Sequence, residues 1–316
     1  MGIVALAGPA APGALGQSYP VKPIRIIIAQ APGSATDVVS RIIGNKLGES
    51  LGQPLVVDAR PGAGGTLGTE LAARAAPDGY TLFMANNSTH GSNPALYAKL
   101  PYDAVRDFAP IIYAVATPYV LSVHPSLPVK TVKELIALAK ARPGQINYAS
   151  AGNGSTHHLC GELLKTLAGI DIVHIPYKGT TPAITALLSG EVSVMFATVT
   201  GIQPHLKSGR ARALAVTTPK RSNMLPEVPT VAEAALPGFE MLSWFGLLAP
   251  AGTPAAIVTR LYADTAKVLE IAEVRAALTA QGFEVIAGSP AQFGDYIRRE
   301  IEKITKLAKA TGIKAE

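Results

Sequence analysis

Short apolar runs alternate with longer segments of mixed polarity along most of the chain. Most of the runs have the length of a strand and lie between Gly, Pro, Asn, Asp or Ser, which favours β-structure. The segments between them carry helix signals. The predicted strands are residues 24–29, 55–58, 81–85, 111–116, 120–123, 146–149, 172–175, 192–197, 211–217, 241–248 and 283–287. This alternation of strands and helices predicts an α/β fold with parallel sheets.

Helix starts are well marked. Two segments have the spacing of a capping box, and three others place a capping hydroxyl before a proline at the first helical position. They are residues 131–134 and 230–233, and residues 181–182, 253–254 and 289–290. No short-period repeat or long flexible linker interrupts the pattern.

Two distant segments are built alike, each with a strand that runs through a small-residue loop into a helix. The first is the strand at 24–29 with the loop 31–37, and the second is the strand at 146–149 with the loop 150–158. Glycine allows close backbone approach, hydroxyls add donors, and a helix N-terminus attracts anions. Two such loops facing each other across a cleft between two lobes would hold a small organic acid. The chain is expected to cross between the lobes at 111–123 and 241–248.

Composition narrows the class of protein. The 316 residues are 48% hydrophobic and 16% charged, which indicates a folded chain of about two domains. The net charge is +6, but Lys and Arg are scattered, so no nucleic acid partner is expected. The single Cys160 excludes an intramolecular disulfide and a multi-cysteine metal site, and we expect a buried thiol. No stretch after residue 18 reaches the roughly 18 apolar residues of a membrane span.

Residues 1–18 differ from the rest of the chain. They are small and apolar, carry no charge, and end in an Ala14-Leu15-Gly16 step that fits a signal-peptide cleavage site. The basic segment of a signal peptide is missing. The leader is interpreted as a signal-peptide remnant, with a disordered Ala/Gly/Pro leader as the alternative.

Several motifs leave alternatives open. Residues 60–69 resemble a dinucleotide-binding loop, but the third glycine of that motif would fall at Leu67, so a third cleft loop or a plain tight turn competes with a nucleotide site. No serine has the flanking glycines of a hydrolase. Adjacent His157 and His158 point about 100° apart on a helix and cannot chelate one metal well. His157 would donate to a carboxylate or stay exposed, and Tyr177 would belong to a binding loop or cover the cleft wall.

Many of these segments match one known family, in order and over essentially the whole chain after residue 18. They are residues 20–25, 31–37, 60–68, 76–81, 148–155, 174–179, 225–233 and 250–254. With them the chain resembles the Bug family, the periplasmic solute receptors of tripartite tricarboxylate transporters. The resemblance implies a two-lobed periplasmic-binding-protein fold (type II-like) that closes like a flytrap on a ligand in the inter-lobe cleft. It also implies di- or tricarboxylate, acidic amino acid or aromatic acid ligands, held by loop backbone, hydroxyls and waters.

The resemblance places the ligand contacts on both lobes. Lobe 1 is expected to comprise residues 19–121 and 240–316, and lobe 2 residues 122–239. The expected contacts are Ala31, Pro32, Gly33, Ser34, Thr36, Asp37, Gly64, Gly65, Thr66, Asn86 and Ser88 in lobe 1, and Ser150, Gly152, Asn153, Ser155, Thr156, His157, Tyr177 and Thr198 in lobe 2.

Two departures from the family pattern concern the ligand. Ser34 replaces the second glycine of the family's first loop, and Ala197-Thr198 stand where many members carry an aspartate that receives a ligand amino group. The second change disfavours an amino acid and leaves di- or tricarboxylates and aromatic acids.

The expected protein is a periplasmic, monomeric receptor without cofactor, metal or catalytic activity. It would deliver its ligand to membrane transporter subunits, or signal occupancy to a sensor partner. An α/β enzyme, such as a nucleotide-dependent dehydrogenase or an acyl hydrolase, is the competing hypothesis.

Overall fold

The computed structural model describes residues 19–314. Its strands are β1 (Ile24–Ile28), β2 (Leu55–Ala59), β3 (Thr81–Asn86), β4 (Phe108–Val123), β5 (Asn147–Ser150), β6 (Val173–Pro176), β7 (Val194–Thr198), β8 (Arg212–Val216), β9 (Leu242–Pro250) and β10 (Glu284–Gly288). Its α-helices are α1 (Ala35–Leu51), α2 (Thr66–Ala73), α3 (Asn93–Leu96), α4 (Val132–Ala141), α5 (Thr156–Ala168), α6 (Thr180–Ser189), α7 (Val199–Lys207), α8 (Val231–Ala234), α9 (Ala255–Glu270), α10 (Ala272–Ala280) and α11 (Pro290–Thr311). A 3₁₀ turn, η1 (Ala63–Gly65), and a π-helical turn, η2 (Ser88–Ser92), complete the set.

The predicted strands are all present, with one difference. Residues 111–116 and 120–123 belong to one strand, β4, which continues through Thr117 and Pro118. Pro118 pairs with β9, and from Tyr119 onward β4 pairs with β7 instead. A proline cannot donate to a ladder, but it is tolerated here because the strand changes neighbours at this point.

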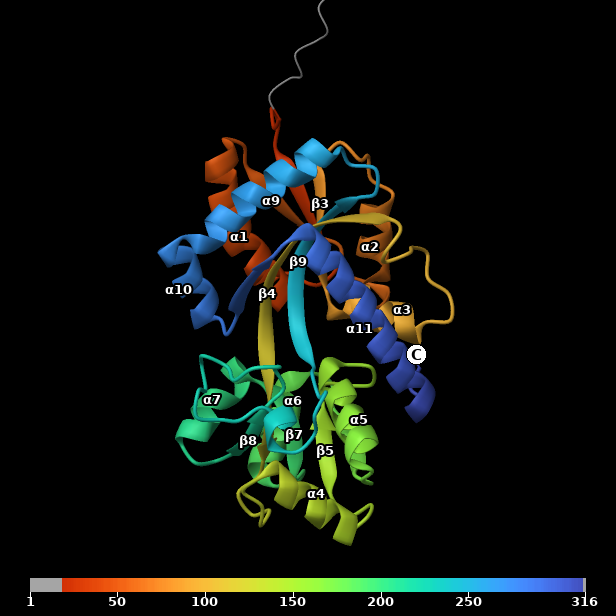
Figure 1. The fold of residues 1–316 in the computed structure, drawn as a ribbon, viewed down its shortest axis with the longest axis vertical. Helices are drawn as coiled ribbons and strands as arrows, with labels where there is room; N and C mark the ends of the chain where they lie inside the picture. Colours follow the sequence, from red (N-terminus) through yellow and green to blue (C-terminus); the bar gives the residue numbers. More distant parts are fainter. Residues whose placement is uncertain (1–18, 315–316) are drawn as a thin grey trace, which may run out of the picture.

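The strands form two groups joined through β4. In the first group β1 pairs in parallel with β2 and β3, while β9 is antiparallel to both β3 and β4. In the second group β5 is parallel to β6 and β7, and β4 pairs antiparallel with β7 and β8. Each group carries its own helices and forms one lobe (Figure 1). The expected α/β two-lobed fold is therefore confirmed, whereas the lobe boundaries proposed from the sequence stay a prediction.

Two strands and one helix connect the lobes. In Figure 1, β4 and β9 run side by side from the upper lobe toward the lower one, and α11 descends beside them. Phe293 and Ile297, in the first half of α11, pack with Trp244 in a lobe 1 core cluster. Ile304 and Leu307, near its end, pack with the lobe 2 core. Helix α11 is thus a brace across the connection, which the sequence pattern did not reveal.

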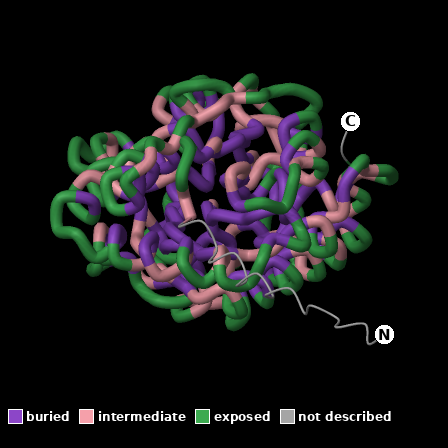
Figure 2. The backbone as a smooth tube through the Cα atoms, turned by 90° about the horizontal axis from the view of Figure 1, so that it is seen from above, coloured by how far each residue is buried: buried purple, intermediate pink, exposed green. Residues whose placement is uncertain are grey.

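Burial follows the pattern predicted for layered α/β lobes. Figure 2, which looks along the long axis of the molecule, shows the buried backbone gathered in the interior and exposed residues around the rim. In α1, Val39, Ile43 and Leu47 are fully buried at helical spacing against the apolar side chains of β1. Cys160 is a buried free thiol, as expected, and burial raises its pKa.

Two expectations concern membranes and the leader. Among the described residues, the helices are all too short or too polar to cross a bilayer. The proposed signal-peptide remnant, residues 1–18, lies outside the described residues.

Glycine packing at the lobe connection generates a stability prediction. A Cβ on Gly246 in β9 would overlap the ring of Phe293 in α11 and lie 2.6 Å from the carbonyl oxygen of Ile112. Gly246→Ala should therefore lower the free energy of unfolding by about 1–3 kcal/mol through overpacking. Urea denaturation followed by circular dichroism measures it.

Gly44→Ala in α1 is the matched control. Its Cβ would make ordinary contacts of 3.4 Å with Ile26 and 3.6 Å with Leu55. Alanine is a better helix former, so this variant should gain up to about 1 kcal/mol. Equal stability changes in the two variants would contradict the packing described for the connection.

Candidate functional site at the lobe interface

The loop after β1 is fixed by a reciprocal cap. Ser34 caps α1 by accepting a hydrogen bond from the backbone N–H of Asp37 at 3.3 Å. The Asp37 carboxylate accepts in return from the N–H of Gly33 at 2.9 Å. Gly33 has φ +80°, a conformation that favours glycine. The hydrogen bond from Arg41 lowers the pKa of Asp37, so this carboxylate is ionised and its charge is compensated.

The loop after β5 has the same construction. Ser155 caps α5 by accepting from the N–H of His158 at 3.4 Å, and the N–H of Gly154 donates to Nδ1 of His158 at 3.1 Å. Gly154 has φ +71°. Nδ1 must be unprotonated to accept this bond, so His158 is neutral, and burial lowers its pKa in agreement. The two similar units in the sequence thus form two similar capped loops, one in each lobe.

The segment after β3 links the first loop to the lobe interface. The Asn86 amide donates to the Thr36 hydroxyl at 3.0 Å, and its carbonyl oxygen accepts from the N–H groups of Ser88 and Thr89. The chain then forms the π-helical turn η2, a geometry often found at functional sites. Asn93, which begins α3, donates to the carbonyl oxygen of Gly64 at 3.0 Å.

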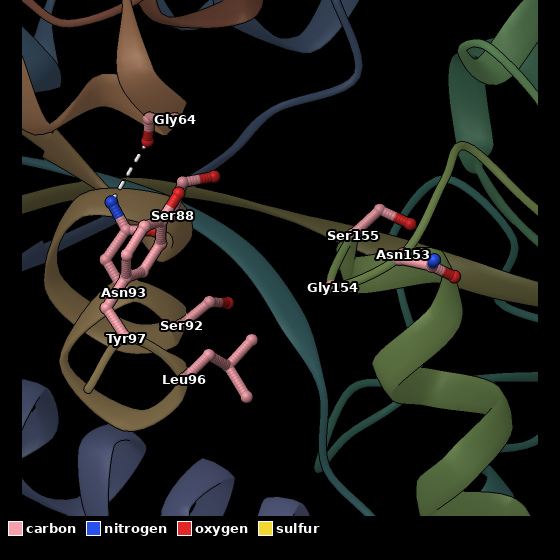
Figure 3. A pocket seen from close by; sticks show the side chains of 9 residues that line it. All are labelled: Gly64, Ser88, Ser92, Asn93, Leu96, Tyr97, Asn153, Gly154 and Ser155. Carbon is pink, nitrogen blue, oxygen red and sulfur yellow. Dashed lines mark hydrogen bonds between the residues drawn. The ribbon is translucent and has the colours of Figure 1, made fainter. Parts of the chain in front are cut away.

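A cavity of about 380 Å³ lies between these lobe 1 segments and the second loop. This volume falls in the range of small-molecule sites, roughly 300–1,000 Å³. Figure 3 shows the two sides facing each other across it. The lining residues are Gly64, Ser88, Ser92, Asn93, Leu96 and Tyr97 from lobe 1, and Asn153, Gly154 and Ser155 from lobe 2.

The structure brings together part of the predicted site. Gly64, Ser88, Asn153 and Ser155 line the cavity. The other predicted contacts are not among its lining residues, although Thr36 and Asn86 are tied to it through the hydrogen bonds to Ser88. Those outside are Ala31, Pro32, Gly33, Ser34, Thr36, Asp37, Gly65, Thr66, Asn86, Ser150, Gly152, Thr156, His157, Tyr177 and Thr198.

Three of the outlying side chains have other partners. The Tyr177 hydroxyl donates to the Glu191 carboxylate at 2.7 Å. The Thr66 hydroxyl donates to the carbonyl oxygen of Ala63 at 2.9 Å. The Ser150 hydroxyl contacts His174 and Gly152.

His157 is buried rather than exposed. Its ring packs edge-on against Tyr119, its Nε2 lies 3.4 Å from the Thr180 hydroxyl, and its Nδ1 is buried without a hydrogen-bond partner. Burial lowers its pKa to about 4, so the imidazole is neutral.

The cavity also includes residues that the motif analysis missed. They are Ser92 at the end of η2, Asn93 and Leu96 in α3, and Tyr97 directly after that helix. Their signal in the sequence is the polar run that begins at Asn86 directly after a buried strand. Ligands of α/β sheets bind at such carboxyl ends, so the run as a whole was a candidate.

The electrostatics of the cavity suit a polar or anionic ligand held without a basic side chain. Among the described residues that line it, none is Lys, Arg, Asp or Glu. Hydroxyls and the amino-terminal end of α5 supply the donors. The described residues also include no group of three His, Cys, Asp or Glu placed to hold a metal ion.

Comparison with known proteins assigns the chain. The profile of the family described as "Tripartite tricarboxylate transporter family receptor" matches residues 39–313. Protein BugT of Bordetella pertussis is 38% identical over 312 residues, which cover 98% of this chain and 95% of BugT.

Two solved structures share the fold. A structure described as R. palustris Rpa4515 with adipate is 37% identical, with a TM-score of 0.78, covering 94% of this chain and 99% of its own. MatC from Rhodopseudomonas palustris with bound malate is 34% identical, with a TM-score of 0.74, covering 92% and 99%.

The family and its structural neighbours are periplasmic binding proteins and not enzymes. The competing enzyme hypothesis is therefore rejected, and the resemblance stated from the motifs is confirmed. The chain belongs to the tripartite tricarboxylate transporter receptor family, to which it is joined by Bug-type relatives over nearly its whole length.

Proposed function

We propose that this protein captures a small carboxylate between its two lobes in the periplasm and delivers it to the membrane subunits of a tripartite tricarboxylate-type transporter. The observation that carries the proposal is the cavity between the lobes, which combines Ser88 and Asn93 of lobe 1 with the capped loop Asn153–Ser155 of lobe 2. A receptor that uses both lobes can couple occupancy to their relative position, which is the signal a transporter needs.

The donor set supports a carboxylate ligand. Carboxylates are acceptors only when ionised, and the cavity offers hydroxyls and backbone N–H groups at the start of a helix. A hydrogen bond to a charged group contributes about 1.5–3 kcal/mol, so a few of them suffice for micromolar affinity.

The ligands of two relatives support the dicarboxylate class. Rpa4515 is described with adipate and MatC with bound malate. The cavity in this chain adds Leu96 and the Tyr97 ring to its polar lining. These side chains would contact the carbon skeleton of a dicarboxylate or the ring of an aromatic acid.

We further propose that the first loop reaches the ligand when the lobes close. Gly33, Ser34 and Thr36 occupy in lobe 1 the same positions around a helix start that Gly154, Ser155 and His157 occupy around α5. In the present structure they do not line the cavity, and a hinge movement would bring them toward it.

Ligand binding is tested by a thermal-shift screen with malate, adipate, citrate and benzoate. A ligand at a hundredfold excess over Kd stabilises the folded state by about 2.7 kcal/mol, which corresponds to roughly 5–10 °C for lobes of this size. Mass spectrometry should recover the acid unchanged. Conversion to a product, or no shift with any organic acid, would contradict the proposal.

The position of the site is tested at Ser88, an exposed residue of the cavity. Ser88→Asp places a negative charge on the lining and should weaken binding of the acid found in the screen at least tenfold, because like charges at short range repel by about 1–4 kcal/mol. Ser88→Asn is the neutral control of similar size and should bind within a few-fold of the unmodified protein. Isothermal titration measures both, and equal affinities would place the ligand elsewhere.

Delivery to a transporter is tested by uptake of the labelled acid into cells. Cells that lack this protein should lose most high-affinity uptake and regain it with the unmodified gene but not with Ser88→Asp. Normal uptake in cells that lack the protein would contradict delivery: the protein would then bind the acid without serving a transporter for it.

A further inference from the structure

The two capped loops differ in one chemical respect. In each, the side chain at the third helical position accepts the N–H of the glycine that precedes the capping serine. Lobe 1 uses the carboxylate of Asp37, which stays ionised because Arg41 lowers its pKa. Lobe 2 uses Nδ1 of His158, an acceptor only while the imidazole is neutral.

His158 is part of a stack beneath the second loop. Its ring lies face to face with that of His174, with centroids 3.9 Å apart and planes 8° apart. The Tyr148 ring packs beside both, with its centroid 5.0 Å from that of His174 and 6.5 Å from that of His158, because β5 and β6 place Tyr148 and His174 next to each other. A Cβ on Gly161 would overlap the Tyr148 ring, so this glycine lets α5 lie directly on the stack.

Both histidines hold the loop. His158 accepts from Gly154, and Nε2 of His174 lies 2.6 Å from the Ser150 hydroxyl. That hydroxyl in turn accepts from the N–H of Gly152 at 3.0 Å. The stacked pair thus fixes the loop at two points on either side of Asn153, a residue that lines the cavity.

We propose that His158, with His174 stacked on it, is a proton-sensitive positioning residue that holds the second loop in its binding geometry only while its imidazole is neutral. Protonation at Nδ1 replaces the acceptor with a donor. This N–H then faces the Gly154 N–H, and two donors repel each other. The loop is then released at the point where it lines the cavity. The consequence for ligand affinity rests on the proposed function, whereas the change in the loop itself does not.

The surrounding charges set the direction of the effect. The titratable groups that face the pair are Tyr148 on β5 and Glu162 and Lys165 on α5, of which Glu162 accepts from both Tyr148 and Lys165. Burial lowers the pKa of His158; Glu162 opposes this shift, and Lys165 adds a smaller lowering effect. Burial lowers the pKa of His174 to about 4, and His158 adds to this. At a pH above 6.5, the ordinary pKa of histidine, His158 is therefore neutral and holds the loop. The loop is released as the pH falls below the lowered pKa of His158.

The loop is observed directly through the amide of Gly154. Residues 153–154 form the only Asn-Gly pair in the sequence, so protein labelled with ¹³C-carbonyl asparagine and ¹⁵N-glycine gives one HNCO signal for this amide. In the ligand-free protein the signal should shift with pH, with a midpoint below 6.5. His158→Asn supplies an uncharged oxygen at the place of Nδ1 and should keep the neutral-pH signal down to acid pH.

Two controls isolate the role of His158. His124→Asn changes a histidine that bonds Ser126 instead, and it should leave the Gly154 transition in place. His158→Phe keeps a stacking ring without an acceptor, and its Gly154 signal should resemble the acid form at every pH. Circular dichroism confirms that each variant is folded. A Gly154 signal that does not move with pH, or that moves equally in His158→Asn, overturns the proposal.

Adipate and malate then test the consequence. If either binds, its Kd in the unmodified protein should rise by about tenfold per pH unit below the Gly154 midpoint relative to His158→Asn, since one proton competes with binding. Titration of the acid itself is common to both proteins and cancels. If no organic acid binds, the proposed function fails, while the Gly154 signal still decides whether the loop responds to protons. A Kd ratio that stays constant with pH overturns the link between the loop and affinity.

Discussion

The ladder between β4 and β9 is the constraint on which the relation of the two lobes depends. It pairs these strands from Phe108 with Pro250 to Pro118 with Leu242, and β4 then continues into the second lobe without a break. The strands are almost wholly buried, and a buried N–H without a partner is costly, so the lobes cannot slide along this ladder. They can bend where β4 exchanges one set of neighbours for another. A connection of this kind favours hinge closure over shear.

The connection through β4 and β9 fixes where the two capped loops lie, and the caps fix their shape. In each loop a glycine with positive φ, a capping serine and an acceptor at the third helical position form a closed set of hydrogen bonds. These bonds occupy the side chains of the capping serine and of the acceptor at the third helical position. Other backbone N–H groups of the first helical turn stay directed outward. The capping side chains therefore fix the shape of each loop, while the predicted ligand contacts of Ser34 and Asp37 stay a prediction.

The sequence predicted the elements well because the local signals were strong. Buried runs such as that at 24–29 are bounded on both sides, and Thr230 forms the capping box that its spacing indicated. Ser289, predicted as a capping hydroxyl before a proline, also caps its helix, whereas Thr181 and Thr253 do not cap theirs. The continuity of β4 was missed because Thr117-Pro118 looks like a break until the neighbouring strands are known. Ser92 and Tyr97 were missed because neither the π-helical turn nor the single-turn helix α3 that follows it has a periodic signature. The stack of His158 on His174 depends on the register between β5 and β6, which no local pattern encodes.

A site with donors but no cation suits a receptor that must release what it binds. A buried arginine facing a carboxylate would hold it through a bidentate pair, but both charges would lose their hydration, and removing the ligand would leave the cation unpaired. Hydroxyls and helix-terminal N–H groups carry only partial charges, so the empty cavity remains stable. At longer range, the anionic ligand is attracted by the net charge of +6, which is spread over the surface and screened beyond about 8–10 Å. Affinity is thereby set by the number of short hydrogen bonds available, and hence by the shape of the loops, which is why a single acceptor beneath one loop can govern it.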